Sequence, residues 1–266
     1  MFIFRIKNFF FIIIFFNNPS RITLKRSFFL SDKFLLFEEI DWSRYFLIFV
    51  IQMFIICTFL TISYKILKRN RTRSNIFLSL FYLLISCSFI LNIIYLPFRE
   101  EGIVYLMYFL ILYLLLLSFI FLLLFNLNLI QFEMTRSKNI IIIIVYAILA
   151  FLLLIYPGGI TINESTNWKP VWSWEFLLLG YVFLTFIVVI PTFFISIKNY
   201  KKFKNEILKR KWAFFFIGLI GFAFGAYGAA LYNTWNDPTF KLIWNFLTLI
   251  VVPSGILIYY GIAKDI

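Results

Sequence analysis

The chain has 266 residues, of which 63% are hydrophobic and 14% are charged. Soluble domains carry about 25% charged residues, and a single soluble core has no room for this much apolar surface. The composition therefore excludes an ordinary soluble protein and predicts an all-α integral membrane protein. The net charge of +13 would suit a nucleic-acid-binding protein. The basic residues, however, lie in short segments between apolar runs rather than on a domain face or tail, so nucleic acid is not an expected partner.

Residues 1–44 form an N-terminal lead-in that contains no membrane span. Its apolar run, Asn8–Phe16, follows a basic start and would rise only about 14 Å as a helix, roughly half of a hydrocarbon core. No cleavage site with small residues follows it. A signal peptide and an interfacial helix therefore both stay open for this segment.

Residues 45–266 form the main domain, which contains seven apolar runs long enough to cross a bilayer. The connections between them are too short for a separate soluble domain. We therefore predict a bundle of seven transmembrane helices at 45–66, 75–97, 103–130, 139–156, 174–197, 212–232 and 242–263.

The stretch Lys198–Lys211 between the fifth and sixth runs holds seven basic residues and one acid, Glu206. Basic loops resist translocation and stay in the cytoplasm. Segments on the same side carry 15 Lys and Arg, and the opposite loops carry 3, with the basic lead-in as the one departure. This bias predicts the cell membrane, an outside N-terminus and a cytoplasmic C-terminus. Contacts with a cytoplasmic partner or lipid headgroups are expected at Lys201, Lys202, Lys204, Lys209, Arg210 and Lys211.

Six of the seven tryptophans fall on the outer side in this topology. One interpretation is an aromatic belt at the membrane interface. The other is a cup for an external ligand, and tryptophan faces with nearby carboxylates suit a cationic or amphipathic one. The residues expected to form the cup are Trp172, Trp174, Glu175, Asn233, Trp235 and Asp237.

The middles of the spans contain no charged residue, and the chain contains no histidine. Charged residues inside a membrane mark ion paths and proton relays, and histidine serves haem and many metal sites. A retinal pigment would need a lysine in the middle of the last span, whereas Lys241 and Lys264 lie at its ends. We therefore expect no enzyme, no cofactor and no metal site.

Small residues mark the sixth span, where four glycines repeat on one helical face. This face predicts close packing within the bundle or, alternatively, a homodimer contact. Pro191 in the fifth span and Pro253 in the seventh predict kinks. The four glycines are Gly218, Gly221, Gly225 and Gly228.

The segments Lys209–Gly218 and Pro253–Lys264 resemble corresponding parts of the seven-helix sensor regions of prokaryotic histidine kinases. The resemblance implies a last helix that leads toward a cytoplasmic output. The chain ends at Ile266 without a kinase domain, so a separate signalling protein is the expected partner. The expected function is that of a receptor or sensor. The alternatives are a small-molecule carrier and a membrane subunit of a larger assembly.

Overall fold

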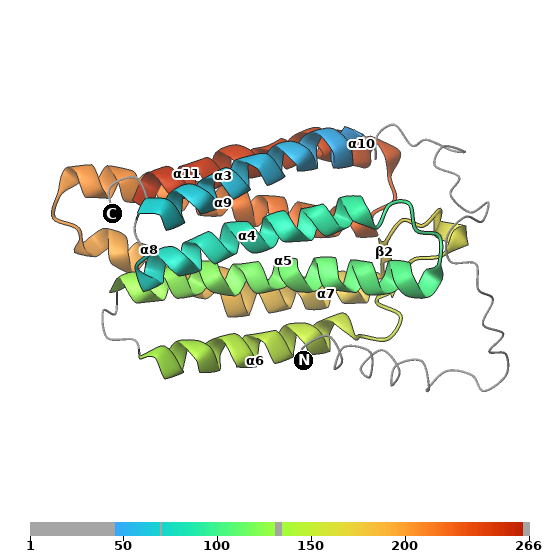
Figure 1. The fold of residues 1–266 in the computed structure, drawn as a ribbon, viewed down its shortest axis with the longest axis horizontal. Helices are drawn as coiled ribbons and strands as arrows, with labels where there is room; N and C mark the ends of the chain where they lie inside the picture. The colour runs from blue at the N-terminus through green and yellow to red at the C-terminus, as the bar shows by residue number, and fades with distance from the viewer. Residues whose placement is uncertain (1–45, 70, 131–134, 263–266) are drawn as a thin grey trace, which may run out of the picture. The chain divides into compact units, whose positions relative to one another are not determined.

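The computed structural model describes residues 46–69, 71–130 and 135–262 (Figure 1). The predicted lead-in of residues 1–44 lies outside the described residues, as do Tyr45 and Lys264. The described part contains seven helical segments of membrane length and one two-stranded sheet.

In the part of the chain that the structure describes, seven helical segments are long and apolar enough to cross a membrane; this confirms the predicted all-α class and agrees with the seven predicted spans. Three of them include a short stretch of wider π-helix or tighter 3-10 helix, labelled η. In chain order the segments are η1 Phe46–Gln52 with α3 Met53–Arg69; α4 Arg73–Ile94; α5 Glu101–Ile130; α6 Arg136–Leu154; α7 Trp174–Phe183, η3 Leu184–Val189 and α8 Ile190–Lys202; α9 Glu206–Thr234; and α10 Pro238–Leu247, η4 Thr248–Ile250 and α11 Val251–Ile262.

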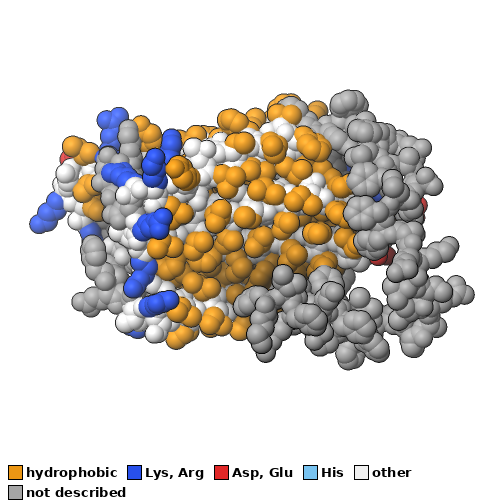
Figure 2. Space-filling view, in the orientation of Figure 1, with side chains coloured by type: hydrophobic (Ala, Val, Ile, Leu, Met, Phe, Trp, Pro, Cys, Tyr) orange, Lys and Arg blue, Asp and Glu red, His pale blue; other side chains and the backbone are white. Residues whose placement is uncertain are grey.

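Bulky apolar side chains cover the sides of these helices (Figure 2). Phe194 is 69% exposed, Phe186 65% and Ile141 59%. Soluble monomers rarely expose continuous apolar surface on this scale, whereas hydrocarbon solvates it well. The chain is therefore a multi-pass membrane protein.

Lys and Arg side chains gather at one end of the helices, which we call the basic end (Figure 2). It holds the α3–α4, α5–α6 and α8–α9 connections. The other end holds the α4–α5, α6–α7 and α9–α10 connections (Figure 1). We call it the cavity end, because residues of these connections line the cavity described in the next subsection. The basic segments that the charge pattern groups together thus lie at the same end of the bundle.

The basic stretch Lys198–Lys211 is mostly helical, which corrects the predicted loop. α8 continues to Lys202 and α9 begins at Glu206, so only three residues connect them. The side chain of Asn205 caps α9 by accepting a hydrogen bond from the backbone N–H of Ile207 at 2.8 Å. Lys, Arg and Glu favour helix, so both helices continue beyond the apolar runs on which the prediction rested.

Both predicted proline sites coincide with a change of helix type. Pro191 follows the π-helical stretch η3, and Pro253 follows the 3-10 turn η4. A proline lacks an N–H and its ring displaces the carbonyl four residues earlier. Those carbonyls belong to Ile187 in η3 and Leu249 in η4, so the irregular turns lie where the prolines disturb the helical hydrogen bonds.

The core forms where α4 packs between α3 and α5, and where α11 runs along α9. An aromatic cluster joins these layers: the ring centroids of Phe59 and Tyr82 lie 5.1 Å apart, and those of Phe81 and Phe222 lie 5.0 Å apart. The buried hydroxyl of Tyr82 donates a hydrogen bond to the carbonyl of Gly255 at 2.7 Å. The second span is thereby fastened to the seventh.

The glycine face of α9 packs against the last span of the same chain. Side chains and backbone of α10 and α11 occupy the space that a β-carbon would need at each position. Packing within the bundle, the first of the two interpretations, therefore accounts for this face. A homodimer stays a prediction and would need a different surface. The four positions are Gly218, Gly221, Gly225 and Gly228.

The long connection before α7 forms a small hairpin at the cavity end. β1 Ile160–Thr161 pairs antiparallel with β2 Val171–Trp172, and the short 3-10 helix η2 Glu164–Thr166 lies between them. Asn163 caps η2, because its side chain accepts a hydrogen bond from the backbone N–H of Thr166 at 3.1 Å. The hairpin is thus an ordered structure with its own hydrogen bonds.

Candidate ligand-binding site

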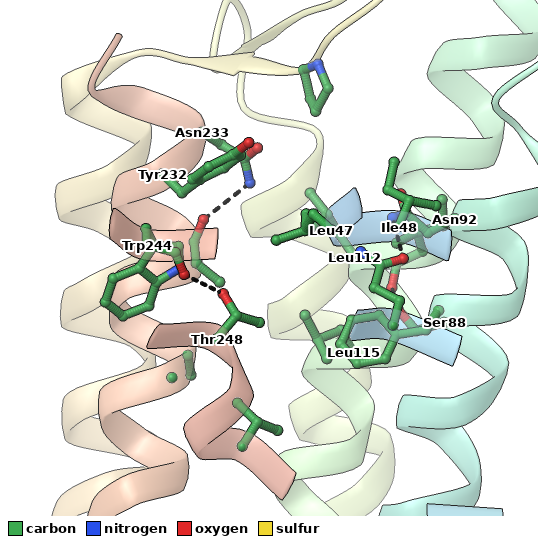
Figure 3. Close-up of a pocket in the computed structure, with 18 of the residues that line it drawn as sticks. Leu47, Ile48, Ser88, Asn92, Leu112, Leu115, Tyr232, Asn233, Trp244 and Thr248 are labelled. Atoms are coloured by element: carbon green, nitrogen blue, oxygen red, sulfur yellow. Dashed lines mark hydrogen bonds between the residues drawn. The ribbon is translucent and has the colours of Figure 1, made fainter. Parts of the chain in front are cut away.

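A cavity of about 420 Å³ lies between spans at the cavity end (Figure 3). One wall comes from η1, α4 and α5, and the facing wall comes from α9 and α10. In Figure 3, Leu47, Asn92 and Leu112 face Tyr232 and Trp244 across the gap. This volume falls in the range of small-molecule sites, which is about 300–1,000 Å³.

The deep part of the cavity is apolar. Its floor is formed by Ile85, Phe119, Phe222 and Val251. The helical rise along α9 places Phe222 of the floor about 16 Å below Asn233. Edge-to-face contacts close the floor, since the ring centroid of Phe222 lies 5.9 Å from that of Phe119. The four side chains of the floor are all apolar and therefore suit a hydrocarbon chain.

Polar groups form a ring nearer the cavity end. The amide of Asn92 donates a hydrogen bond to Gln52 Oε1 at 2.8 Å, which ties the first two spans together. Asn233 Nδ2 donates to the carbonyl of Ala229 at 3.1 Å, and Thr248 Oγ1 donates to that of Trp244 at 2.8 Å. A carboxamide has two donor hydrogens and a carbonyl oxygen, so these amides have capacity beyond the bonds described here.

Among the described residues that line the cavity, the charged ones are both lysines, Lys169 and Lys241. Among the described residues that line it there is no carboxylate. Lys241 Nζ donates a hydrogen bond to Asn236 Oδ1 at 2.7 Å and lies 5.6 Å from the ring centroid of Tyr232. In the described part of the chain, lysines rather than carboxylates line the cavity, in contrast to the carboxylate-lined site that the sequence suggests.

The structure brings one of the six predicted cup residues, Asn233, to the cavity. The others do not line it. Trp172 packs inward, donating its indole N–H to the hydroxyl of Tyr108 at 2.9 Å, and its ring lies edge-on to Phe176. Trp172 therefore fastens the hairpin to the third span.

The remaining predicted cup residues lie on the surface or at helix starts. Trp174 is 55% exposed, and Trp235 is 46% exposed with its ring stacked on Phe240 at 4.9 Å. Asp237 caps α10 by accepting a hydrogen bond from the backbone N–H of Phe240 at 2.6 Å. Glu175 lies exposed in the first turn of α7. The exposed tryptophans fit the aromatic-belt interpretation.

The six basic residues predicted for inner contacts lie together at the basic end. They occupy the last turn of α8, the three-residue connection and the start of α9. Lys201, Lys202, Lys204 and Arg210 are exposed, whereas Lys209 and Lys211 are half-buried. Lys209 Nζ forms an ion pair with Glu206 at 2.7 Å. An exposed pair of this kind contributes little to stability, so the cluster is chiefly a cationic surface.

Most cavity residues were missed by sequence reasoning, because they are scattered over five spans. A signal for some of them existed, since Gln52, Asn92 and Asn233 are amides within or beside apolar runs. Among the described residues, no three His, Cys, Asp or Glu side chains gather into a metal-binding group. Comparison with protein-family models and with curated protein sequences finds no match for the chain.

Proposed function

We propose that this chain is a receptor or sensor of the cell membrane, with the cavity end outside and the basic end in the cytoplasm. A small molecule enters the cavity from outside, and a cytoplasmic protein recognises the resulting change in the helices at the basic end of α8 and α9. The observation that carries the proposal is a cavity that lies at the end opposite the basic end and has an apolar floor. The resemblance to sensor regions of histidine kinases points to the same class.

The basic half of the bundle is packed below the cavity floor. Tyr82 bonds to Gly255, and the rings of Phe125 and Phe215 lie 6.0 Å apart between α5 and α9. Gly261 of α11 lies against the backbone of Lys211 and Phe215. A carrier needs a path that opens to both sides, whereas a receptor needs access from one side. The closed basic half therefore favours the receptor.

The contact between α9 and the last span offers a route from the cavity to the basic end. Gly228 contacts Trp244, and Gly225 contacts Val251. Gly225, Trp244 and Val251 also line the cavity. Further along, Gly218 and Gly221 meet Ser254, and Gly261 meets the carbonyl of Lys211. With glycine at these positions the helices touch closely, so a ligand that displaces Trp244 would shift α9 and α11 together.

Side-specific labelling tests the proposal against the carrier alternative. A Thr248→Cys variant, with Cys57 and Cys87 replaced by serine, is reconstituted into vesicles and exposed to a membrane-impermeant maleimide from either side. We expect labelling only from the side of the hairpin, with Lys204→Cys as a control labelled only from the other side. Labelling of Thr248→Cys from both sides would favour a carrier and overturn the receptor.

A further inference from the structure

We infer that the cavity binds a neutral amphiphile, an apolar body that carries an uncharged hydroxyl or amide group, and that the carboxamides of Gln52, Asn92 and Asn233 recognise that group. This inference rests on the proposed function, because it names the class of ligand for the same cavity. The sequence suggested a cationic or an amphipathic ligand, and the inference keeps only the second of these classes.

The recognition begins with a pair of carboxamides between the first two spans. Asn92 Nδ2 donates a hydrogen bond to Gln52 Oε1 at 2.8 Å, and both residues line the cavity. In the part of the chain that the structure describes, this is the only hydrogen bond of either side chain. Gln52 is 7% exposed, so the surrounding helices hold its side chain in place. The pair therefore offers a ligand the Gln52 N–H groups as donors and the Asn92 oxygen as an acceptor.

A third carboxamide lies on the opposite wall of the cavity (Figure 3). Asn233 Nδ2 donates to the carbonyl of Ala229 at 3.1 Å, within its own helix. Among the described residues the side chain of Asn233 has no other hydrogen-bond partner. Its oxygen is therefore a second acceptor for a ligand in the cavity.

The mixture of donors and acceptors decides the kind of head group. A hydroxyl or an amide both donates and accepts, so it is able to bond to Gln52 and to one of the two asparagine oxygens at once. A carboxylate only accepts and leaves the asparagine oxygens without a donor. An ammonium group only donates and leaves the Gln52 N–H groups without an acceptor. Because an unpaired polar group in a desolvated site weakens binding, the carboxamides favour a neutral head group.

The two lysines of the cavity lining have no part in this recognition. Lys241 Nζ bonds to Asn236 and lies over the ring of Tyr232. Lys169 and Lys241 both take part in further interactions within the protein. The preference for a neutral head group therefore rests on the carboxamides alone.

The apolar body of the ligand follows from the side chains deeper in the cavity. On α4 the helical rise places Ile85 about 10 Å below Asn92, and on α9 it places Phe222 about 16 Å below Asn233. On both walls the carboxamides thus lie nearer the cavity end than the apolar floor. A volume of about 420 Å³ suits a small amphiphile with its head group at the carboxamides and its apolar body on the floor.

The experiment measures thermal unfolding of the full chain in phosphatidylcholine nanodiscs with probes of equal chain length. These are decanol, decanamide and decyl methyl ether, with decanoate and decylamine in their charged forms, compared at equal concentration in the lipid. We expect decanol and decanamide to raise the midpoint at about tenfold lower concentration than the others, because the others leave a polar group unpaired. A response to decanol alone assigns a hydroxyl, and a response to decanamide alone assigns an amide. Both of these outcomes support the inference.

Matched variants locate the recognition. Gln52→Leu/Asn92→Leu replaces both partners of the bond together, and should lower the affinities for decanol and decanamide by about tenfold, to that of the ether. Asn128→Leu/Asn139→Leu removes another carboxamide pair, bonded at 3.2 and 3.3 Å between α5 and α6 at the basic end, and should keep the preference. Asn233→Leu removes the acceptor on the opposite wall and should lower the same two affinities. It provides the test if the first double variant fails to fold.

Three outcomes would overturn the inference and leave the receptor proposal standing. The first is stabilisation by the ether or by a charged probe that equals or exceeds that by decanol and decanamide. The second is a preference for decanol and decanamide that survives the replacement of the cavity carboxamides by leucine. The third is no stabilisation by any probe, while Thr248→Cys is still labelled from the hairpin side alone. Labelling from both sides would instead remove the receptor proposal, whichever probe binds.

Discussion

The indole ring of Trp244 lies against the α-carbon of Gly228, in the space that a β-carbon at this position would occupy. Trp244 belongs to α10 and Gly228 to α9, so this contact sets how closely the two helices approach beside the cavity. Trp244 is 5% exposed and lines the cavity. The absence of a side chain at Gly228 is therefore what allows the tryptophan to form part of the cavity wall.

Replacing Gly228 by alanine should lower the thermal stability of the protein and change the cavity. The added methyl group overlaps the buried Trp244 ring, and overpacking of this kind costs about 1–3 kcal/mol. Gly180→Ala on α7 is a matched control, because nothing lies within 4 Å of its added β-carbon. That control should be neutral or slightly stabilising, since alanine favours helix. Thermal unfolding in nanodiscs measures both, and equal effects at the two positions would contradict the prediction.

Trp172→Phe should destabilise the protein more than Trp174→Phe. The first change removes the indole N–H that bonds to the Tyr108 hydroxyl and frees the hairpin from the third span. The second changes a ring that is 55% exposed. A neutral hydrogen bond contributes about 1 kcal/mol, so the difference should appear as a lower unfolding midpoint for Trp172→Phe only. Faster proteolysis between β1 and β2 in that variant would provide a second measurement.

Tyr82→Phe should weaken the contact between the second and seventh spans. The change deletes the hydroxyl that donates to the Gly255 carbonyl at 2.7 Å and leaves the ring packing intact. Hydrogen bonds between membrane helices contribute about 0.6 kcal/mol on average and up to about 1.7. Because this hydroxyl is fully buried, we expect a loss in the upper part of that range, measured by unfolding in a denaturing detergent. An unchanged unfolding curve would show that the bond carries no net stability.

Thr192→Val on α8 should stabilise the protein, in contrast to the other changes. Thr192 is 3% exposed, and its hydroxyl has no hydrogen-bond partner among the residues that the structure describes. Removing a buried polar group that lacks a partner recovers about 1–3 kcal/mol on scales from protein mutations. Thr185→Val is the matched control, because that hydroxyl bonds to Tyr227 at 2.5 Å and its loss should destabilise. Destabilisation by Thr192→Val would indicate that a water molecule serves the hydroxyl in the void of about 30 Å³ beside it.

The sequence predicted the spans well because crossing a bilayer is a local property. Hydropathy over about twenty residues decides whether a segment spans, and no knowledge of its neighbours is needed. The ends of the helices were less accurate at the basic stretch, where α8 and α9 extend to Lys202 and Glu206. The apolar run ends at the membrane boundary, whereas the helix itself continues because lysine and arginine favour helical backbone hydrogen bonding.

The site was predicted poorly because it depends on which face of each helix turns inward. Trp172 and Trp174 are two residues apart, yet the first packs inward and the second is mostly exposed. Composition cannot distinguish them, since the difference arises from the pairing of β2 with β1 and the start of α7 at Trp174. Residues such as Leu47, Phe119 and Val251 line one cavity only once five spans are brought together.

The tight connection between α8 and α9 has a consequence for whatever binds at the basic end. A three-residue turn joins the two helices into an antiparallel pair. The indole N–H of Trp212 on α9 donates to the carbonyl of Ser196 on α8 at 2.7 Å and holds the pair together. The backbone positions of the basic residues on α8 and α9 are therefore fixed relative to one another, unlike those of a flexible tail. Docking of an acidic partner or an anionic lipid surface there would therefore cost little backbone conformational entropy in this chain.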